Sequence, residues 1–143
     1  MSQENVELVK SIYSEGREYT AFVDSEATEG ELAEWRPRYH PEYEFHAVVE
    51  GNRLVEHGLD GYLRLMRDWL APWESYTIAG DEFYDLEPDG VAVTTRHRGR
   101  MKDSGAEIRT EGVDLWTLRN GRLLRLEAYL DREMGLQAAG LSE

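Results

Sequence analysis

The feature that most constrains the fold of this chain is an antiparallel hairpin near its end, in residues 114–141. Residues 115–118 are apolar and aromatic, which is typical of a strand. Asn120 and Gly121 follow, and both tolerate the positive φ angles of a type I′ turn, so this pair is a strong hairpin signal. Residues 123–130 then form the return strand. A long hairpin of this kind is expected to place one face against the core.

The same hairpin carries polar groups that need a structural or chemical reason to be there, because a polar group facing a core costs free energy unless it is paired. Asp114 and Glu127 are the two such groups, and aromatic residues flank them. Asp131 follows the return strand and is placed to cap a last helix that ends near Gly140.

The hairpin carries a characteristic spacing of residue types. These residues are Trp116, Thr117, Gly121, Leu123, Arg125, Tyr129 and Asp131, and an Ala-Ala-Gly-Leu tail follows at residues 138–141. In this pattern the chain resembles the SnoaL-like branch of the nuclear transport factor 2-like superfamily, a group that includes ketosteroid isomerases and polyketide cyclases. The resemblance covers nearly the whole chain. It implies the fold more specifically than the function, because one fold hosts many different sites.

Two helices are predicted before the first strand. Val6, Val9 and Tyr13 fall at helical spacing within a wide apolar stripe, so the first helix should pack on a large surface such as a sheet. Thr28 and Glu31 form a capping-box pattern that opens a short second helix, and a proline ends it.

The remaining elements are mostly strands. The first is predicted over residues 43–49. A third helix is predicted over residues 59–73, and it is apolar over more than half of its circumference, so it should be buried on two sides. Three long strands follow over residues 76–86, 91–101 and 106–118, with turns between them.

This order of elements predicts an α+β fold with helices on one face of an antiparallel sheet. The resemblance makes the prediction more specific: it implies a cone-shaped, curved antiparallel sheet wrapped around the N-terminal helices, with a cavity at one end. The length of 143 residues suits a single domain over residues 1–143 with a sizeable core.

Composition excludes several classes of function. The net charge of −13 disfavours nucleic acid and anionic membrane as partners, since both need a basic surface; a well-solvated acidic surface explains this charge more simply than an acidic-partner role. No cysteine is present, so the chain has no disulfide, thiolate nucleophile or cysteine-based zinc site. The first ten residues lack an apolar signal core, and we expect a cytoplasmic location.

Asp114 and Tyr13 are the first candidate catalytic residues, and both come from the resemblance. Asp114 matches the position where ketosteroid isomerases place an oxyanion-stabilising aspartic acid, and Tyr13 matches the tyrosine that shares the oxyanion hole. A carboxylic acid held neutral by an apolar site can donate a hydrogen bond to a developing enolate. The alternatives are a surface or arginine-paired aspartate and a core tyrosine. Alternation along the strand does not decide which face of it points inward.

His46 and His97 are the candidate bases. The isomerase base is an aspartate in the strand that here contains His46, and the missing aspartate argues against steroid isomerisation. A histidine can act as a base near neutral pH, although a hydrogen-bonded structural role is the simpler alternative. His97 shares a strand face with apolar residues, and the opposite face carries Arg96, Arg98 and Arg100. We expect this arginine row to be solvated and paired with acidic residues across the sheet, such as Glu107, Glu111 or Glu127.

We expect no metal and no cofactor. The four histidines are scattered, without the spacing of a metal site, at His40, His46, His57 and His97. No dinucleotide fingerprint or phosphate-binding loop is present in the sequence. The candidate contacts for an apolar ligand are Trp69, Trp116, Tyr129, Tyr62 and Met66, for which core packing is the alternative.

Two functions remain open at this stage. One is a small-molecule-binding protein that performs cofactor-free acid–base chemistry, as an isomerase, aldol cyclase or hydrolase, on an apolar carbonyl or polycyclic compound. Asp114 would then be the acid or oxyanion donor, Tyr13 a second donor, and His46 or His97 the base. The other is a non-catalytic ligand-binding or dimerisation module. A homodimer through the exposed sheet face, which is common in the superfamily, is expected with either function.

Overall fold

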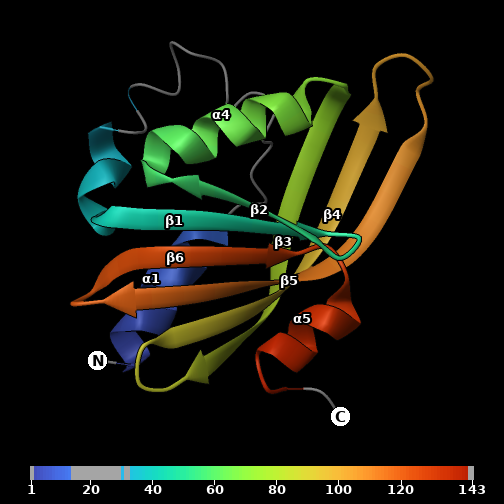
Figure 1. The fold of residues 1–143 in the computed structure, drawn as a ribbon. Helices are drawn as coiled ribbons and strands as arrows, with labels where there is room; N and C mark the ends of the chain where they lie inside the picture. The colour runs from blue at the N-terminus through green and yellow to red at the C-terminus, as the bar shows by residue number, and fades with distance from the viewer. Residues whose placement is uncertain (1, 14–29, 31–32, 142–143) are drawn as a thin grey trace.

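The computed structural model describes residues 2–13, 30 and 33–141. Helices pack around one six-stranded sheet in this part of the chain (Figure 1). In chain order the elements are α1 (Ser2–Tyr13), η1 (Arg36–Arg38), β1 (Tyr39–Val49), β2 (Asn52–His57), α4 (Gly58–Leu70), β3 (Trp73–Leu86), β4 (Gly90–Met101), β5 (Glu107–Arg119), β6 (Arg122–Tyr129) and α5 (Arg132–Ala138).

The sheet has the strand order β2-β1-β6-β5-β4-β3. Every neighbouring pair is antiparallel except β1 and β6, which run parallel. The long strands β3, β4 and β5 curve, and the sheet does not close on itself (Figure 1). The fold is therefore the α+β cone that the family resemblance implied, with one parallel pair that the sequence did not indicate.

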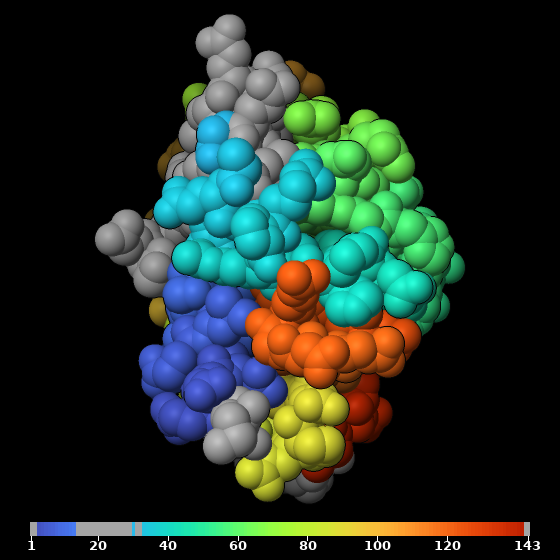
Figure 2. Space-filling view, turned by 90° about the vertical axis from the view of Figure 1, so that its left-hand side faces the viewer, coloured from blue at the N-terminus to red at the C-terminus, as the bar shows by residue number. Residues whose placement is uncertain are grey.

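The helices define an inner and an outer face of this sheet. Tyr13 of α1 bonds to Asp114 on β5, so the even-numbered side of β5 faces inward at this point. Gly135 of α5 packs against Val113, the neighbouring residue on the opposite side of the strand. At one end of the molecule, β1 (cyan) and the β5–β6 turn (orange) lie between α1 (blue) and α4 (green) (Figure 2). Thus α1 packs mainly on β3 and β4 and reaches the inner face of β5 with Tyr13, whereas α5 covers the outer face of β5. The prediction that the helices lie on one face of the sheet is therefore wrong for α5.

The predicted hairpin and final helix are confirmed. Asn120 and Gly121 have φ angles of 52° and 75°, as a type I′ turn requires. The side chain of Asp131 accepts a hydrogen bond from the backbone N–H of Met134 at 3.0 Å, so it caps α5.

Several boundaries differ from the sequence predictions, and one strand was not predicted. The third helix, α4, ends at Leu70 rather than at residue 73, because Pro72 has no N–H to continue the helical bonding and Trp73 instead opens β3. Strand β1 begins at Tyr39, four residues before the predicted start. The segment Asn52–His57 forms the edge strand β2, whose side chains are mostly exposed, so it lacked an alternating apolar signal.

The capping box predicted for Thr28 and Glu31 lies outside the described residues. None of the helices in the described part of the chain is both long enough and apolar enough to cross a membrane.

Candidate functional site

A cavity of about 610 Å³ lies between α1, α4 and the inner face of the sheet. This volume is in the range of pockets that hold drug-sized molecules. Its wall is mainly apolar and aromatic, with contributions from Phe45, Tyr62, Met66, Trp69 and Leu126. The polar side chains of the wall include Tyr13, Asp114, Tyr76 and His97.

The first cluster of polar side chains in the cavity wall consists of three hydrogen-bonded residues and ends at Asp114. The indole N–H of Trp116 donates to the hydroxyl oxygen of Tyr13 at 2.8 Å. The Tyr13 hydroxyl in turn donates to Oδ2 of Asp114 at 2.5 Å. Asp114 and Trp116 face the same side of β5, because they are two residues apart, and Tyr13 reaches them from the C-terminal end of α1.

Burial makes Asp114 an unusual carboxyl group. Its exposed fraction is 6%, and desolvation raises its pKa from 3.8 to about 6, although the hydrogen bond from Tyr13 acts in the opposite direction. A carboxyl with such a pKa exchanges a proton easily near neutral pH. Among the residues that the structure describes, no arginine or lysine contributes to this pKa, so none of them pairs with Asp114 as in the alternative prediction.

The second polar cluster is the pair of Tyr76 and His97. The Tyr76 hydroxyl lies 2.8 Å from Nδ1 of His97, and the two rings meet edge to face. His97 has an exposed fraction of 7%, and burial lowers its pKa from 6.5 to about 4. Burial also raises the pKa of Tyr76 to about 12, and the charge of Asp114 contributes in the same direction. Both groups are therefore neutral at physiological pH.

The two polar clusters stand at different points of the same inner face. His97 pairs across the sheet with Thr110, and Asp114 pairs with Val93. Thr110 and Asp114 are four residues apart on one strand, which corresponds to at most about 13 Å. One molecule that fills the cavity can therefore meet both clusters with different atoms.

His46 is not brought to this cavity. It lies on the outer face of β1. Its neighbours Phe45 and Ala47 lie on the inner face and line the cavity. Nη1 of Arg53 donates to Nδ1 of His46 at 3.0 Å, so Nε2–H donates to Oε1 of Glu44, also at 3.0 Å. Both ring nitrogens are thus engaged in a surface network, which is the structural role given above as the alternative.

Four of the five predicted ligand contacts line the cavity, namely Tyr62, Met66, Trp69 and Trp116. Tyr129 does not; its hydroxyl accepts a hydrogen bond from Arg53 at 3.2 Å. The four side chains border the cavity without filling it. Tyr76 is a site residue that sequence reasoning missed, because it opens a predicted strand and nothing nearby in the sequence pairs it with His97.

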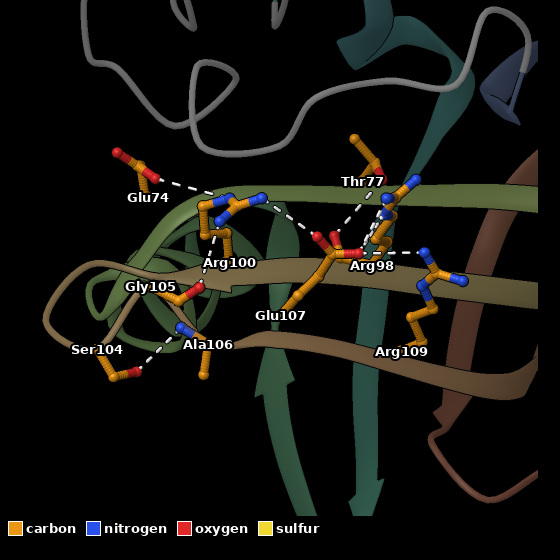
Figure 3. A network of polar contacts seen from close by, with 9 residues as sticks. All are labelled: Glu74, Thr77, Arg98, Arg100, Ser104, Gly105, Ala106, Glu107 and Arg109. Atoms are coloured by element: carbon orange, nitrogen blue, oxygen red, sulfur yellow. Dashed lines mark hydrogen bonds and ion pairs between the residues drawn. The ribbon is translucent and has the colours of Figure 1, made fainter.

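The outer arginine row is paired with acidic residues, as predicted. Arg98 and Arg100 bind Glu107 at 2.9 and 3.2 Å, and Arg109 also contacts it at 3.2 Å (Figure 3). Arg96 pairs with Asp81 at 2.7 Å. Among the residues that the structure describes, no three histidine, aspartate or glutamate side chains gather closely enough to hold a metal ion.

Solved structures with this fold include several small-molecule-associated proteins. A candidate SnoaL-like polyketide cyclase from Jannaschia sp. CCS1 is 18% identical, with a TM-score of 0.70 over 99% of this chain and 94% of that chain. TerC, co-crystallised with polyporic acid, is 21% identical, with a TM-score of 0.64 over 90% and 92% of the two chains. A protein from Catenulispora acidiphila in complex with trimethylamine is 13% identical, with a TM-score of 0.58 over 73% and 78%.

At these identities the likeness shows a shared fold. No curated protein matches the sequence. The sequence profile of the SnoaL-like domain matches residues 19–126, which is most of the chain. The chain therefore belongs to the SnoaL-like domain family.

Proposed function

We propose that this protein binds a small, largely apolar carbonyl compound in its cavity and moves a proton on it, with Asp114 as the acid–base group. The observation that carries this proposal is the Tyr13–Asp114 pair in the cavity wall. A buried carboxyl group with a pKa of about 6, hydrogen-bonded at 2.5 Å and facing an apolar cavity, suits proton transfer.

The chemistry follows from the two forms of this carboxyl. At neutral pH Asp114 is mostly ionised in the free protein, and its carboxylate can take a proton from the carbon beside a ligand carbonyl. In an isomerisation, the resulting Asp114 carboxylic acid can then return that proton to another carbon of the enolate. In an aldol-type cyclisation, the enolate carbon instead bonds to a second carbonyl carbon of the ligand, and the acid gives its proton to the alkoxide formed there. One group that first accepts and then donates a proton is sufficient for an isomerisation or an aldol-type cyclisation without a cofactor.

This assignment changes the roles that the sequence suggested. His97 has a pKa of about 4, so it is a weaker base than Asp114 at neutral pH. His46 is engaged on the outer face by Glu44 and Arg53. Tyr13 already donates its proton to Asp114, so it is a positioning residue for that carboxyl rather than a free oxyanion donor.

The test uses two bicyclic probes, because the natural substrate is unknown. 2-Tetralone is a ketone with exchangeable protons beside its carbonyl, and 2-naphthol resembles its enol form. We expect the wild-type protein to accelerate exchange of these protons with deuterium in D2O, followed by NMR. Asp114→Asn should lower the exchange rate by about 10²- to 10⁴-fold while 2-naphthol, followed by its fluorescence, still binds. Asp85→Asn, on the exposed part of β3, is the matched control.

The outcomes separate two functions. Exchange that depends on Asp114 supports the acid–base enzyme. Binding of 2-naphthol without accelerated exchange would contradict it and support a non-catalytic ligand-binding protein. The position of His46 favours that second candidate, since this predicted base lies on the outer face of β1 and is engaged there by Glu44 and Arg53. Absence of binding for both probes would overturn both candidates.

A homodimer through the outer sheet face remains part of the proposal. This face carries charged pairs around Glu107, so such an interface would be polar and sensitive to salt (Figure 3). Sedimentation at low and high salt is the measurement. A monomer under both conditions would contradict the dimer.

A further inference from the structure

A second cavity, of about 450 Å³, adjoins the first on the inner face of the sheet. Six residues line both cavities, namely Val49, Glu50, Trp69, Tyr76, His97 and Leu130. The inward row of β5 runs from Asp114 in the first cavity to Thr110 and Ile108 in the second. The two cavities therefore form neighbouring parts of one track along the sheet.

His97 stands at the junction with an unused polar atom. Its Nε2 is buried and has no hydrogen-bond partner among the described residues. The imidazole is otherwise fixed, because Nδ1 is bound to the Tyr76 hydroxyl at 2.8 Å. A buried nitrogen without a partner costs free energy. Nε2 has almost no accessible surface, so a ligand atom that enters the junction bonds to it after a small movement of the side chains that cover it, and this bond would offset that cost.

The surroundings of Tyr76 indicate which ring nitrogen of His97 carries the proton. Trp69 forms a side-chain hydrogen bond with Tyr76 that lowers the Tyr76 pKa, and an indole N–H can only donate. The Tyr76 oxygen thus accepts from Trp69. We assign the Tyr76 proton to its bond with Nδ1 of His97, a contact in which either group can be the donor. Nδ1 is then an acceptor, so in the neutral imidazole Nε2 carries the hydrogen.

The second cavity itself suits an uncharged apolar chain. Trp73, Ile108 and Met134 form much of its wall, and Ile108 and Met134 are 45% and 40% exposed. Its titratable carboxyl groups are Glu50 and Asp131, which would repel an anionic tail.

We propose that the ligand of this protein extends through both cavities, and that Nε2–H of His97 donates a hydrogen bond to a carbonyl oxygen in the middle of it. The ligand is then a ring system, held near Asp114, that carries an acyl chain, which enters the second cavity. This inference rests on the proposed function for the ring-binding end only. It assigns to His97 the role of a specificity-determining residue, distinct from the proton transfer at Asp114.

The experiment compares three probes: 2-naphthol, 6-hexyl-2-naphthol and 6-hexanoyl-2-naphthol. The last two differ in the carbonyl group next to the ring. We expect the wild-type protein to bind the hexanoyl probe about tenfold more tightly than the hexyl probe, as one buried hydrogen bond implies. His97→Phe should abolish this preference, and His97→Gln, which keeps an N–H donor, should restore part of it.

The matched control for His97 is Thr95→Val. Thr95 lies on the same strand face, and its Oγ1 is also buried without a partner in the described part of the chain, but it lines neither cavity. The preference for the hexanoyl probe should survive in this variant. An unchanged preference in His97→Phe, or its loss in Thr95→Val, would overturn the role of His97.

Thr110→Phe tests the second cavity, because Thr110 lines only that cavity. It should weaken binding of both long probes about tenfold or more and leave 2-naphthol unchanged. Arg109→Phe places the same side chain on the outer face and should change none of the three affinities. Equal binding of the long probes to wild type and Thr110→Phe would overturn the extended site. Failure of the wild-type protein to bind 2-naphthol would instead refute the proposed function.

Discussion

The hydroxyl of Tyr13 lies 2.5 Å from Oδ2 of Asp114, although the two residues are 101 positions apart in the sequence. This bond joins the end of α1 to the middle of β5, and the Tyr13 ring also packs edge to face on Phe83 of β3 at 5.7 Å. The position of α1 thus controls both the wall of the cavity and the ionisation of its acid.

Replacing Tyr13 with phenylalanine should raise the pKa of Asp114 above its value of about 6. The reason is that the Tyr13 hydrogen bond stabilises the carboxylate form, and burial alone would remain after its loss. The measurement is the titration of the Asp114 carboxyl carbon by NMR. Tyr84→Phe, on β3, is the control for loss of a tyrosine hydroxyl elsewhere. An Asp114 pKa that is unchanged or lower in Tyr13→Phe would show that the hydrogen bond does not set it.

Replacing Asp114 with asparagine should make the protein more stable at pH 7.5. The folded protein holds the Asp114 proton up to about pH 6, whereas the unfolded chain loses it near 3.8, so the ionised carboxyl costs the folded state about 3 kcal/mol above pH 6. We expect a gain of about 1 to 3 kcal/mol at pH 7.5 that shrinks towards zero near pH 4. Urea unfolding at several pH values measures it. A gain that does not vary between pH 4 and 7.5 would contradict the raised pKa.

His97 should have the opposite effect on acid stability. Its pKa falls from 6.5 to about 4 on folding, so the unfolded chain takes up this proton first and stability declines as the pH falls from 6.5 to 4. As the pH falls from 6 to 4, this loss of stability is opposed by the stability that the protein gains when Asp114 is protonated. The test is therefore made in the Asp114→Asn background.

In that background, His97→Gln should lose less stability between pH 7 and 4.5 than the single variant, by about 1 to 3 kcal/mol in urea unfolding. His57→Gln is the control, because the His57 side chain is 76% exposed. Equal acid sensitivity with and without His97 would rule out the lowered pKa.

Gly112→Ala should destabilise the fold by about 2 to 4 kcal/mol. A Cβ at this position would lie 2.2 Å from the backbone oxygen of Tyr129, so β5 and β6 could not keep their present separation. Gly30→Ala, where a Cβ meets nothing within 4 Å, is the control. Urea unfolding measures both variants, and a Gly112→Ala protein as stable as the control would show that the strands adjust freely.

Much of the local structure was predictable, because it depends on neighbouring residues. The Asn120–Gly121 turn, the Asp131 cap and the pairing of the outer arginines all follow from side-chain chemistry and short-range geometry. The family pattern added the curved sheet, which periodicity by itself does not contain. These features are decided within one element or between adjacent strands.

The site required tertiary structure for a physical reason. Alternation shows which residues share a strand face, but only the packing of the helices on the sheet decides which face lines the cavity. That packing places Asp114 of β5 on the inner face, and it leaves His46 on the outer face of β1.

The pairing of Tyr76 with His97 shows the same limit. The register between β3 and β4 shifts between Gly80 and Glu82, so Tyr76 faces Gly99 and lies diagonal to His97. A hairpin without that shift would place Tyr76 opposite Arg100, on the outer face. The sequence by itself determined the elements, the turns and the residue types of the site, whereas the helix packing and one shift of register decided which of those residues meet.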